Sequence, residues 1–393
     1  MSHGAKTALV IGGSNGLGYA LVLQLLEIDY QRIIVLDKVK PESDNPKIQH
    51  FYLDLSKGNL DILEQFNNIN TLIITAGFGR IASFNTFSEI EIKNIFQVNT
   101  VSIIQIIRYF YNKIKSDEQF YCAIISSISG IVSSPLFSLY GATKSALYRF
   151  IESINIELEK EGSQNRILNV CPGMLQGTSF YGDKTDVISI KIVANTILEL
   201  MKKRKTLFIP QYDEIYHKVI DRYLEDSYHF GLESYDYKLR SGRINTVPSI
   251  TIGYLSGTFD LFHIGHLNLL RQAKEYCDYL VVGVHRDALH KGKETFIPFK
   301  ERCEIVKSIK YVDRVIESKF EDADVYEELR YNFLFVGSDY KGTARFEKYE
   351  KYFEDKNVKI IYFPYTKETN STKLRMILED TLKANIVSPP DLK

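Results

Sequence analysis

The sequence is short of the features that mark secreted, membrane-spanning and nucleic-acid-binding proteins. It has four cysteines, with no CxxC spacing and no clustering with histidine, which predicts buried free thiols and a reducing compartment rather than a disulfide framework or a metal site. Lysine plus arginine equals aspartate plus glutamate at 49 each, so no net charge attracts nucleic acid or an anionic membrane. No apolar run approaches the length of a membrane span, and residues 1–20 lack a signal-peptide pattern. We therefore expect a cytoplasmic protein without nucleic-acid or membrane partners.

The 393 residues predict an α/β protein with more than one domain. Apolar strands alternate with longer helical stretches as far as residue 209, the pattern of a Rossmann-type, doubly wound parallel sheet. We expect a first domain over residues 1–237, a polar linker over residues 238–249, and a second, smaller Rossmann-like α/β domain over residues 250–393. Residues 211–237 are expected to be helical, and the role of residues 211–245 stays open. Long helices are predicted at 89–111 and 140–161, and the first strands at 7–11, 32–36, 48–53, 71–75, 121–126, 166–170 and 206–209.

A glycine-rich loop follows the first expected strand and opens a helix. Glycines at that place let a pyrophosphate approach the backbone at the helix N-terminus. The loop residues expected to face a dinucleotide are Gly12, Ser14, Asn15, Gly16 and Gly18. Asp37, at the end of the second strand, is placed to bind the adenosine ribose hydroxyls and to repel a 2′-phosphate. NADH is therefore favoured, while Lys38 leaves NADPH open.

A tyrosine and a lysine four residues apart form the expected chemical centre of this domain. Tyr140 and Lys144 share one face of a helix, where the ammonium would lower the pKa of the phenol. Such a tyrosine can give a proton to a carbonyl oxygen while hydride arrives at the carbon. Ser127 lies beyond an upstream strand, and Asn99 lies in the preceding helix.

Together these residues resemble the short-chain dehydrogenase/reductase family over about residues 5–210. The resemblance implies Tyr140 as general acid, Ser127 as hydrogen-bond donor to the substrate carbonyl, Lys144 as the residue that orients the ribose, and Asn99 as holder of a relay water. It also implies cofactor contacts from Asp54, Ala76, Gly77, Pro172 and Gly173. Ile11 and Ile74-Thr75 depart from the family pattern and weaken detailed cofactor contacts, but all four catalytic positions are filled.

The most specific motif of the chain is GTFDLFHIGH at residues 257–266. It places the imidazoles of His263 and His266 between an apolar strand and a helix, where helix amides attract phosphate and imidazoles can stabilise charge on a phosphoryl group in transfer. The segment resembles the signature of glycerol-3-phosphate, choline-phosphate and ethanolamine-phosphate cytidylyltransferases, over about residues 250–380. The resemblance implies that both histidines act at the α-phosphate of CTP while a substrate phosphate attacks in line and pyrophosphate leaves, with Mg²⁺.

Further residues are implied by this resemblance to bind the nucleotide. A lysine of the pair 291/293 and Arg302 would bind phosphates, and residues 371 and 372 would bind the triphosphate. The full implied set is Gly257, Thr258, Phe259, Asp287, Lys291, Lys293, Arg302, Asp339, Ser371 and Thr372. Residues 310–316 resemble the YVDEVI segment of cytidylyltransferases and favour CTP over ATP, which other HxGH enzymes use.

The two motif sets predict a bifunctional enzyme that makes a CDP-alditol for surface polysaccharide. A reductase would convert a ketose phosphate or a CDP-linked ketose, giving a CDP-glucitol, CDP-mannitol or CDP-ribitol, and the order of the two steps stays open. The alternatives are a cytidylyltransferase with a non-catalytic nicotinamide-binding module, and a glycerol-phosphate-specific enzyme. Both families often form homo-oligomers, so one is expected here by resemblance.

Overall fold

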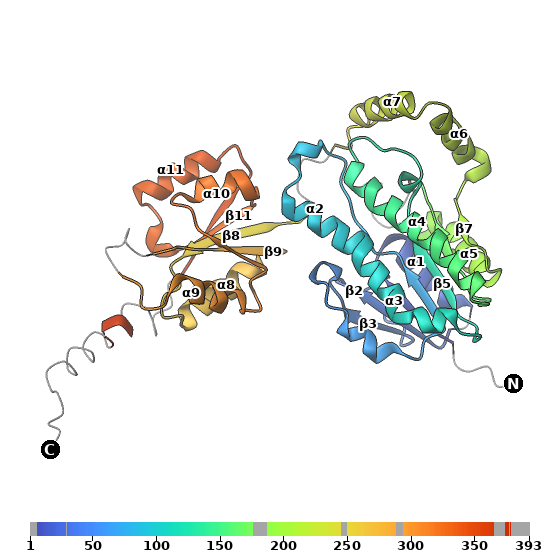
Figure 1. Cartoon of the computed structure of the whole chain (residues 1–393), viewed down its shortest axis with the longest axis horizontal. Helices are drawn as coiled ribbons and strands as arrows, with labels where there is room; N and C mark the ends of the chain where they lie inside the picture. Colours follow the sequence, from blue (N-terminus) through green and yellow to red (C-terminus); the bar gives the residue numbers. More distant parts are fainter. Residues whose placement is uncertain are drawn as a thin grey trace, which may run out of the picture. The chain divides into compact units, whose positions relative to one another are not determined.

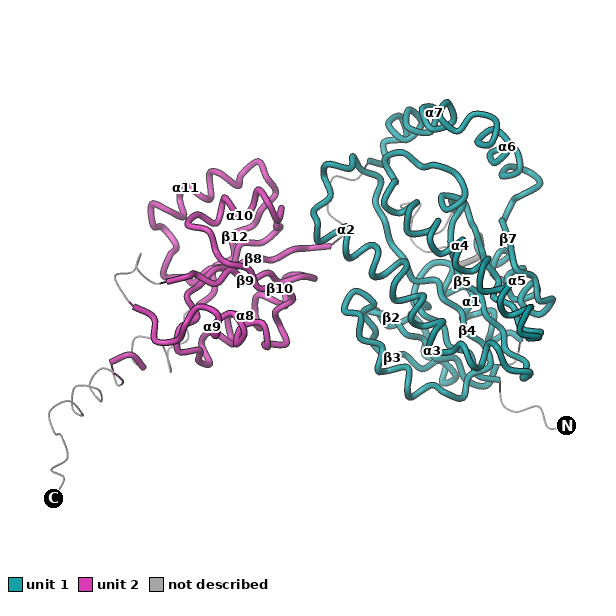
Figure 2. Tube along the Cα trace, in the orientation of Figure 1, with its two compact units in different colours: residues 1–249 teal, residues 250–393 magenta. Residues whose placement is uncertain are grey.

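The structure is a computed structural model that describes residues 6–28, 30–175, 187–244, 250–287, 294–364, 374–376 and 378. The chain divides into two compact units, Met1–Ser249 and Ile250–Lys393, which we call the first and the second unit (Figure 2). Each unit is built around its own parallel sheet, as the fold-class prediction required. Among the described residues, none of the helices combines the length and the apolar character that crossing a membrane demands.

The first unit has, within its described residues, a seven-stranded sheet in the order β3-β2-β1-β4-β5-β6-β7. All pairings are parallel, and the sheet is buried on both faces because its central strands are apolar throughout. One core cluster packs under α3 and α4 and the other under α1 and α5, so two pairs of helices cover opposite faces (Figure 1). The strands are β1 Thr7–Ile11, β2 Arg32–Asp37, β3 Ile48–Tyr52, β4 Thr71–Ile74, β5 Tyr121–Ile125, β6 Ile167–Val170 and β7 Leu207–Phe208.

The helices of this unit follow the predicted order with one interruption. The single helix expected at 89–111 is divided by a π-helical turn at Gln97–Val101, which carries Asn99. Such turns insert an extra residue and recur at functional sites. The helices are α1 Gly16–Glu27, α2 Glu89–Phe96, α3 Ser102–Lys115, α4 Ser138–Lys160, α5 Val187–Lys202, α6 His217–Glu225 and α7 Ser227–Arg240.

Helix α7 runs three residues into the segment predicted as a linker. Its residue Lys238 is buried, and the ammonium donates to Ser134 Oγ at 2.8 Å and to Pro135 O at 2.9 Å. These contacts tie the end of α7 to the first unit, so the polar composition of residues 238–240 reflects a docked helix end rather than a spacer.

The second unit has, in its described part, a five-stranded parallel sheet in the order β10-β9-β8-β11-β12. Figure 1 shows α8 and α9 on one side of this sheet and α10 and α11 on the other. The strands are β8 Ile252–Gly257, β9 Tyr279–Val284, β10 Arg314–Glu317, β11 Phe333–Gly337 and β12 Lys359–Phe363, and the helices are α8 Ile264–Glu275, α9 Phe299–Lys307, α10 Asp322–Leu329 and α11 Ala344–Phe353.

All four cysteines are free thiols. Cys122, Cys171 and Cys277 are buried, and Cys303 is partly buried. Burial raises the pKa of the Cys171 thiol to about 12, so it stays protonated at neutral pH. The prediction of buried free thiols is confirmed for three of the four.

Candidate active sites

The glycine loop of the first unit closes tightly at the start of α1. Gly12 has a φ of +86°, and a Cβ added at Gly18 would lie 2.1 Å from the carbonyl oxygen of Gly12. Only glycine fits such an approach, because any larger residue would displace backbone. The turn at residues 12–18 therefore brings the N-terminus of α1, with its partial positive charge, to the carboxyl end of β1, where a pyrophosphate fits.

Asp37 lies beside this loop, as the sequence predicted. One carboxylate oxygen accepts a hydrogen bond from Ser14 N at 3.0 Å and the other from Val39 N at 3.2 Å. Asp54 accepts from Ser56 N at 3.0 Å, and its carboxylate is 3.9 Å from Lys38 Nζ. The carboxylate at the end of β2 is thus hydrogen-bonded to the glycine loop, and the carboxylate after β3 lies near Lys38.

Asn99 connects the π-helical turn to the loop after β4. Its side chain is fully buried, accepts from Phe78 N at 3.0 Å and donates to Phe78 O at 2.8 Å. It also donates to Thr143 Oγ1 at 3.2 Å, on α4 between the two predicted catalytic residues. Asn99 therefore fixes the position of α4 against the β4 loop. Sequence reasoning missed Thr143, which no motif singles out.

Tyr140 and Lys144 lie on one face of α4, and both are buried. Lys144 Nζ donates to Ile125 O at 2.9 Å and stands 5.6 Å from the centre of the Tyr140 ring. A Cβ added at Gly77 would meet Lys144 Nζ at 3.1 Å and Asn99 Oδ1 at 3.3 Å. The absence of a side chain at Gly77 thus leaves room for the lysine and the asparagine beneath the backbone. The structure brings three predicted catalytic residues to one place.

Ser127 closes the arrangement at the end of β5. Its hydroxyl accepts from Ser129 N at 3.1 Å, donates toward Pro172 O at 3.4 Å, and hydrogen-bonds Tyr140. Pro172 O also accepts from Ile128 N at 3.0 Å. The carboxyl ends of β5 and β6 are therefore joined next to the tyrosine, at the edge of the sheet where parallel α/β proteins bind ligands.

The expected lowering of the phenol pKa is wrong for this structure. Burial raises the pKa of Tyr140 above its ordinary value, and the hydrogen bond from Ser127 offsets this only in part. Burial also lowers the pKa of Lys144 to about 8. The Lys144 ammonium instead donates to Ile125 O and lies 5.6 Å from the centre of the Tyr140 ring. A protonated phenol is the form that a general acid requires.

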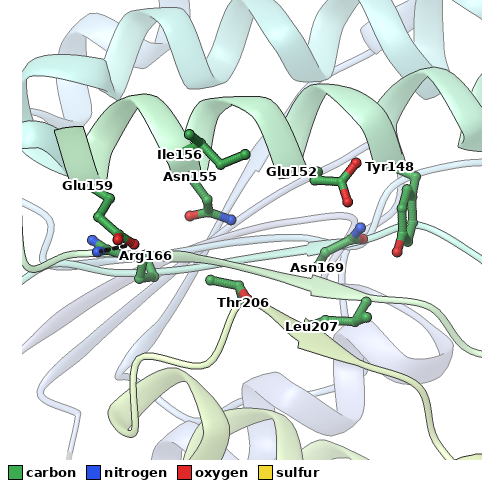
Figure 3. Close-up of a pocket in the computed structure, with 9 residues that line it drawn as sticks. All are labelled: Tyr148, Glu152, Asn155, Ile156, Glu159, Arg166, Asn169, Thr206 and Leu207. Carbon is green, nitrogen blue, oxygen red and sulfur yellow. Dashed lines mark hydrogen bonds and ion pairs between the residues drawn. The ribbon is translucent and has the colours of Figure 1, made fainter. Parts of the chain in front are cut away.

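A hollow among the described residues of the first unit does not contain these residues. It measures about 270 Å³ and lies between α4 and the β6–β7 edge (Figure 3). Glu152 and Asn169 line it, and Arg166 forms an ion pair with Glu159 across one end at 3.2 Å. Tyr140 and Lys144 are not among its lining residues, so this hollow is separate from the predicted centre.

The GTFDLFHIGH loop of the second unit is held in an unusual backbone conformation. Phe259 has a φ of +54° and Leu261 a φ of +48°, a region that residues with a side chain rarely adopt. Between them the buried Asp260 carboxylate accepts from Phe296 N and Ile297 N at 3.0 Å each, and pairs with Arg375 at 2.9 Å. Local strain of this kind persists only where surrounding contacts hold it. Sequence reasoning gave no role to Asp260 or Arg375.

The two histidines form the N-terminal cap of α8. His263 Nδ1 accepts from Gly265 N at 3.0 Å, His266 Nδ1 accepts from His263 N at 3.4 Å, and the rings stack with centres 4.0 Å apart. An accepting Nδ1 places the proton of the neutral ring on Nε2. Burial lowers the pKa of His263, which favours that neutral form. Each neutral ring then has an Nε2–H donor at the N-terminus of α8, a suitable place for an oxyanion.

Arg302 does not have the exposed position that direct phosphate binding needs. Its side chain is fully buried, and it donates to the carbonyl oxygens of Ile297 at 2.9 Å, His285 at 2.8 Å and Arg286 at 2.7 Å, and also to that of Thr258. In this arrangement the guanidinium ties the β8, β9 and α9 loops together. We therefore correct its expected role to positioning the motif loop.

The other predicted nucleotide contacts divide into three groups. Gly257, Thr258 and Phe259 lie in the motif loop at the end of β8, and Asp287 and Asp339 lie exposed at the ends of β9 and β11. The hydroxyl Oγ1 of Thr258 is the one buried side-chain polar atom that lacks a hydrogen-bond partner within the described residues. Such an atom invites a ligand oxygen. The predicted residues that lie outside the described part are Lys291, Lys293, Ser371 and Thr372.

Neither unit shows a resident metal centre in its described residues, where no group of three or more histidine, cysteine, aspartate or glutamate side chains converges. Magnesium that arrives with a nucleotide needs fewer protein ligands than a dedicated site, because it keeps waters and binds phosphate oxygens. Within the described part of the predicted site, the exposed carboxylates of Asp287 and Asp339 are suited to such a magnesium ion.

Known proteins resemble each unit separately. A short-chain dehydrogenase family model matches residues 6–187, and a cytidylyltransferase-like family model matches residues 254–383. An uncharacterized oxidoreductase of Saccharomyces cerevisiae is 34% identical over 187 residues, which are 45% of this chain and 57% of that protein, so the chain spans just over half of that relative's length.

Two further relatives are nucleotidyltransferases by name. Glycerol-3-phosphate cytidylyltransferase of Bacillus subtilis is 35% identical over 123 residues, 30% of this chain and 90% of that protein. An FAD synthase of Thermococcus sibiricus is 30% identical over 128 residues, 31% of this chain and 86% of that protein. These matches show that the chain belongs to the cytidylyltransferase-like family through residues 254–383, and that it carries a short-chain dehydrogenase domain over residues 6–187.

Proposed function

We propose that the first unit is an NAD(P)H-dependent ketose reductase. The convergence of Asn99, Ser127, Tyr140 and Lys144 at the carboxyl edge of the sheet carries this proposal. NAD(P)H supplies the hydride when bound. The protonated Tyr140 gives its proton to the carbonyl oxygen, Ser127 holds that oxygen, and Lys144 binds the ribose beneath Gly77. Asp37 favours NADH, and Lys38 keeps NADPH possible.

For the second unit, CTP-dependent transfer of a cytidylyl group to a sugar or polyol phosphate is proposed. The substrate phosphate attacks the α-phosphate in line and pyrophosphate leaves, with Mg²⁺ on the phosphates. His263 and His266 donate from Nε2 to the α-phosphate oxygens as charge develops there. The Thr258 hydroxyl, which has no hydrogen-bond partner within the described residues, supports a polar ligand at this loop. The resemblance of residues 310–316 to the YVDEVI segment supports cytosine over adenine.

Combined, the two activities would make a CDP-alditol. A ketose phosphate such as fructose 6-phosphate or ribulose 5-phosphate would give a CDP-glucitol, CDP-mannitol or CDP-ribitol, with reduction before or after cytidylyl transfer. By analogy with other CDP-polyols, the product would supply surface polysaccharide. We place the protein in the cytoplasm and expect it to form a homo-oligomer.

A glycerol-phosphate route is the second candidate. The observation that favours it is the 35% identity to an enzyme named for glycerol 3-phosphate. The reductase would then act on dihydroxyacetone phosphate and the product would be CDP-glycerol. The chemistry is the same in both routes, and only the polyol differs.

The test uses the purified full chain with Mg²⁺, CTP or ATP, and NADH or NADPH, against the three ketose phosphates. Cofactor oxidation and pyrophosphate release are followed separately, each with the other cosubstrate omitted. We expect oxidation and CTP-dependent pyrophosphate release with the same ketose phosphate, and the omissions give the order of steps. Pyrophosphate release without oxidation of either cofactor for all three ketoses would reject the reductase and favour a non-catalytic first unit. Preference for ATP would reject the cytidylyl assignment.

A further inference from the structure

Helices α6 and α7 lie outside the sheet layers of the first unit and follow its last strand (Figure 1). Helix α7 and the π-helical turn Tyr212–Tyr216 that precedes α6 contact two loops that leave the carboxyl ends of β5 and β6. A Cβ added at Gly231 of α7 would lie 3.7 Å from Ser133 Oγ, and one at Gly173 would collide with the Tyr216 hydroxyl at 1.5 Å. The helical pair is therefore packed against the rim of the proposed reductase centre.

Two cations stand at this rim. Lys238 Nζ donates to Ser134 Oγ and Pro135 O, and to Ser234 Oγ at 3.1 Å, all of them neutral acceptors. Arg243 points its guanidinium at the sulfur of Met174 and over the ring of Tyr237, 5.4 Å from the ring centre. Within the described residues, neither cation forms an ion pair with a carboxylate.

The two cations are also near enough to influence each other. Burial, together with the positive charge of Arg243, lowers the pKa of Lys238 to about 8. Two like charges held together without a carboxylate cost free energy, and a bound anion would remove that cost. A guanidinium group matches the geometry of the oxygens of a phosphate ester. The Met174 sulfur and the Tyr237 ring are weak partners, so the Arg243 guanidinium can leave them to bind a phosphate.

The segments that contact the two cations lie close in the chain to residues that contact Ser127 and Tyr140. Residue 174 lies two positions after Pro172, and the Ser127 hydroxyl donates toward the carbonyl oxygen of Pro172. Residues 133–135 come shortly before Phe137, and the Phe137 ring stacks on that of Tyr140 with the ring centres 4.2 Å apart. A ligand that reached Arg243 would thus extend from the loop that holds Ser127. We infer that Arg243, supported by Lys238, binds the phosphate of the ketose during its reduction, so that the reductase requires a phosphorylated substrate; this inference rests on the proposed reductase function.

The test compares Arg243→Gln with Arg240→Gln in the full chain. Arg240 is an exposed arginine at the end of α7, three residues before Arg243, and its Nε donates to Asp236 O at 3.3 Å, so it is a matched control. Cofactor oxidation is measured with each ketose phosphate, with the corresponding CDP-linked ketose, and with the phosphate-free ketose. We expect Arg243→Gln to raise KM for the phosphorylated substrate about tenfold or more, as for the loss of a charge-assisted hydrogen bond, with little change in kcat.

Two further comparisons separate phosphate binding from a structural role. Arg243→Lys should recover part of the lost affinity because it keeps the charge, and the KM for NADH should stay unchanged in all variants. The preference of the unmodified chain for phosphorylated over phosphate-free ketose should shrink in Arg243→Gln. Whichever of the ketose phosphate and the CDP-linked ketose shows the larger KM increase is the source of the bound phosphate.

The outcomes distinguish this inference from the function beneath it. If the unmodified chain reduces a ketose phosphate and Arg243→Gln behaves like Arg240→Gln, the phosphate site is wrong and the reductase stands. If the chain prefers phosphate-free ketoses, the inferred substrate class is wrong while reduction itself remains. If no ketose of any kind oxidises either cofactor, the reductase function fails and the inference fails with it.

Discussion

In the first unit the groups expected to carry chemistry are buried on α4, on the π-helical turn before α3 and at the end of β5, whereas in the second they lie on a loop with left-handed backbone. Lys144 is 2% exposed and Asn99 0% exposed, and each is fixed by hydrogen bonds to backbone. His263 and His266 are partly exposed, and their loop owes its shape to the buried Arg302 and Asp260. The first candidate site depends on a charge buried beside Tyr140, and the second on a strained loop held at the start of α8.

The comparison predicts that the reacting residues of the two units can be removed independently. Tyr140→Phe deletes the general acid while keeping the ring, so we expect cofactor oxidation to fall by about 10³-fold or more. Pyrophosphate release should stay within twofold of the unmodified chain, the scatter expected of a remote surface change. Loss of both activities would show that the two centres are coupled.

His266→Ala is the counterpart in the second unit. It removes an Nε2–H donor and the Nδ1 acceptor of the loop cap, so CTP-dependent pyrophosphate release should fall by about 10²–10³-fold. The matched control is His229→Ala, an exposed histidine of α7. Normal transfer by His266→Ala would remove the histidine pair from the mechanism.

Arg302→Met tests whether the motif loop depends on a buried cation. The change leaves carbonyl oxygens of Thr258, His285 and Arg286 without their donor, at a cost of about 3 kcal/mol to the stability of the second unit. Arg302→Lys should recover little, since an ammonium cannot reach several carbonyls in a fork. Hydrogen exchange would detect faster exchange at β8 and α8, with the first unit unaffected. Unchanged exchange combined with weaker CTP binding would restore Arg302 as a direct phosphate ligand.

The smallest expected effect concerns the buried charge at Lys144. Its pKa is about 8 in the folded protein and 10.5 ordinarily. Between those values the unfolded chain binds more protons than the folded one, so stability should rise with pH. Relative to Lys144→Met, the unmodified chain should gain about 2 kcal/mol from pH 7.5 to pH 10. Urea unfolding at several pH values measures this, and a flat difference would mean that Lys144 is not buried as a charge.

The sequence was informative where function constrains local spacing. The glycine loop, the Tyr140–Lys144 pair and the two histidines all lie where their motifs placed them, at strand ends and helix starts. Element order was predictable from apolar strands because buried parallel strands are apolar throughout. Apolar patterning does not predict β10, α10 and α11, because these elements are short or polar. Their aromatic anchors, such as Tyr349, are revealed only by burial in the core.

Roles that depend on burial were beyond the sequence. The residue types around Arg302 do not show whether this arginine binds phosphate or positions the motif loop from a buried site, since both roles need a guanidinium near the motif. The same holds for Tyr140, whose pKa is set by burial more than by the lysine four residues away. The π-helical turn at Gln97–Val101 was also missed, because its inserted residue does not disturb the apolar pattern of the helix.

The most direct test of the central claim follows one hydrogen atom through both units. The full chain is given a ketose phosphate, CTP, Mg²⁺ and NADH or NADPH deuterated at the transferred position, and the CDP-linked product is analysed by mass spectrometry. We predict a CDP-alditol that carries one deuterium on the carbon that was the ketose carbonyl. A CDP-linked product without deuterium, across the three ketose phosphates and both cofactors, would contradict the account.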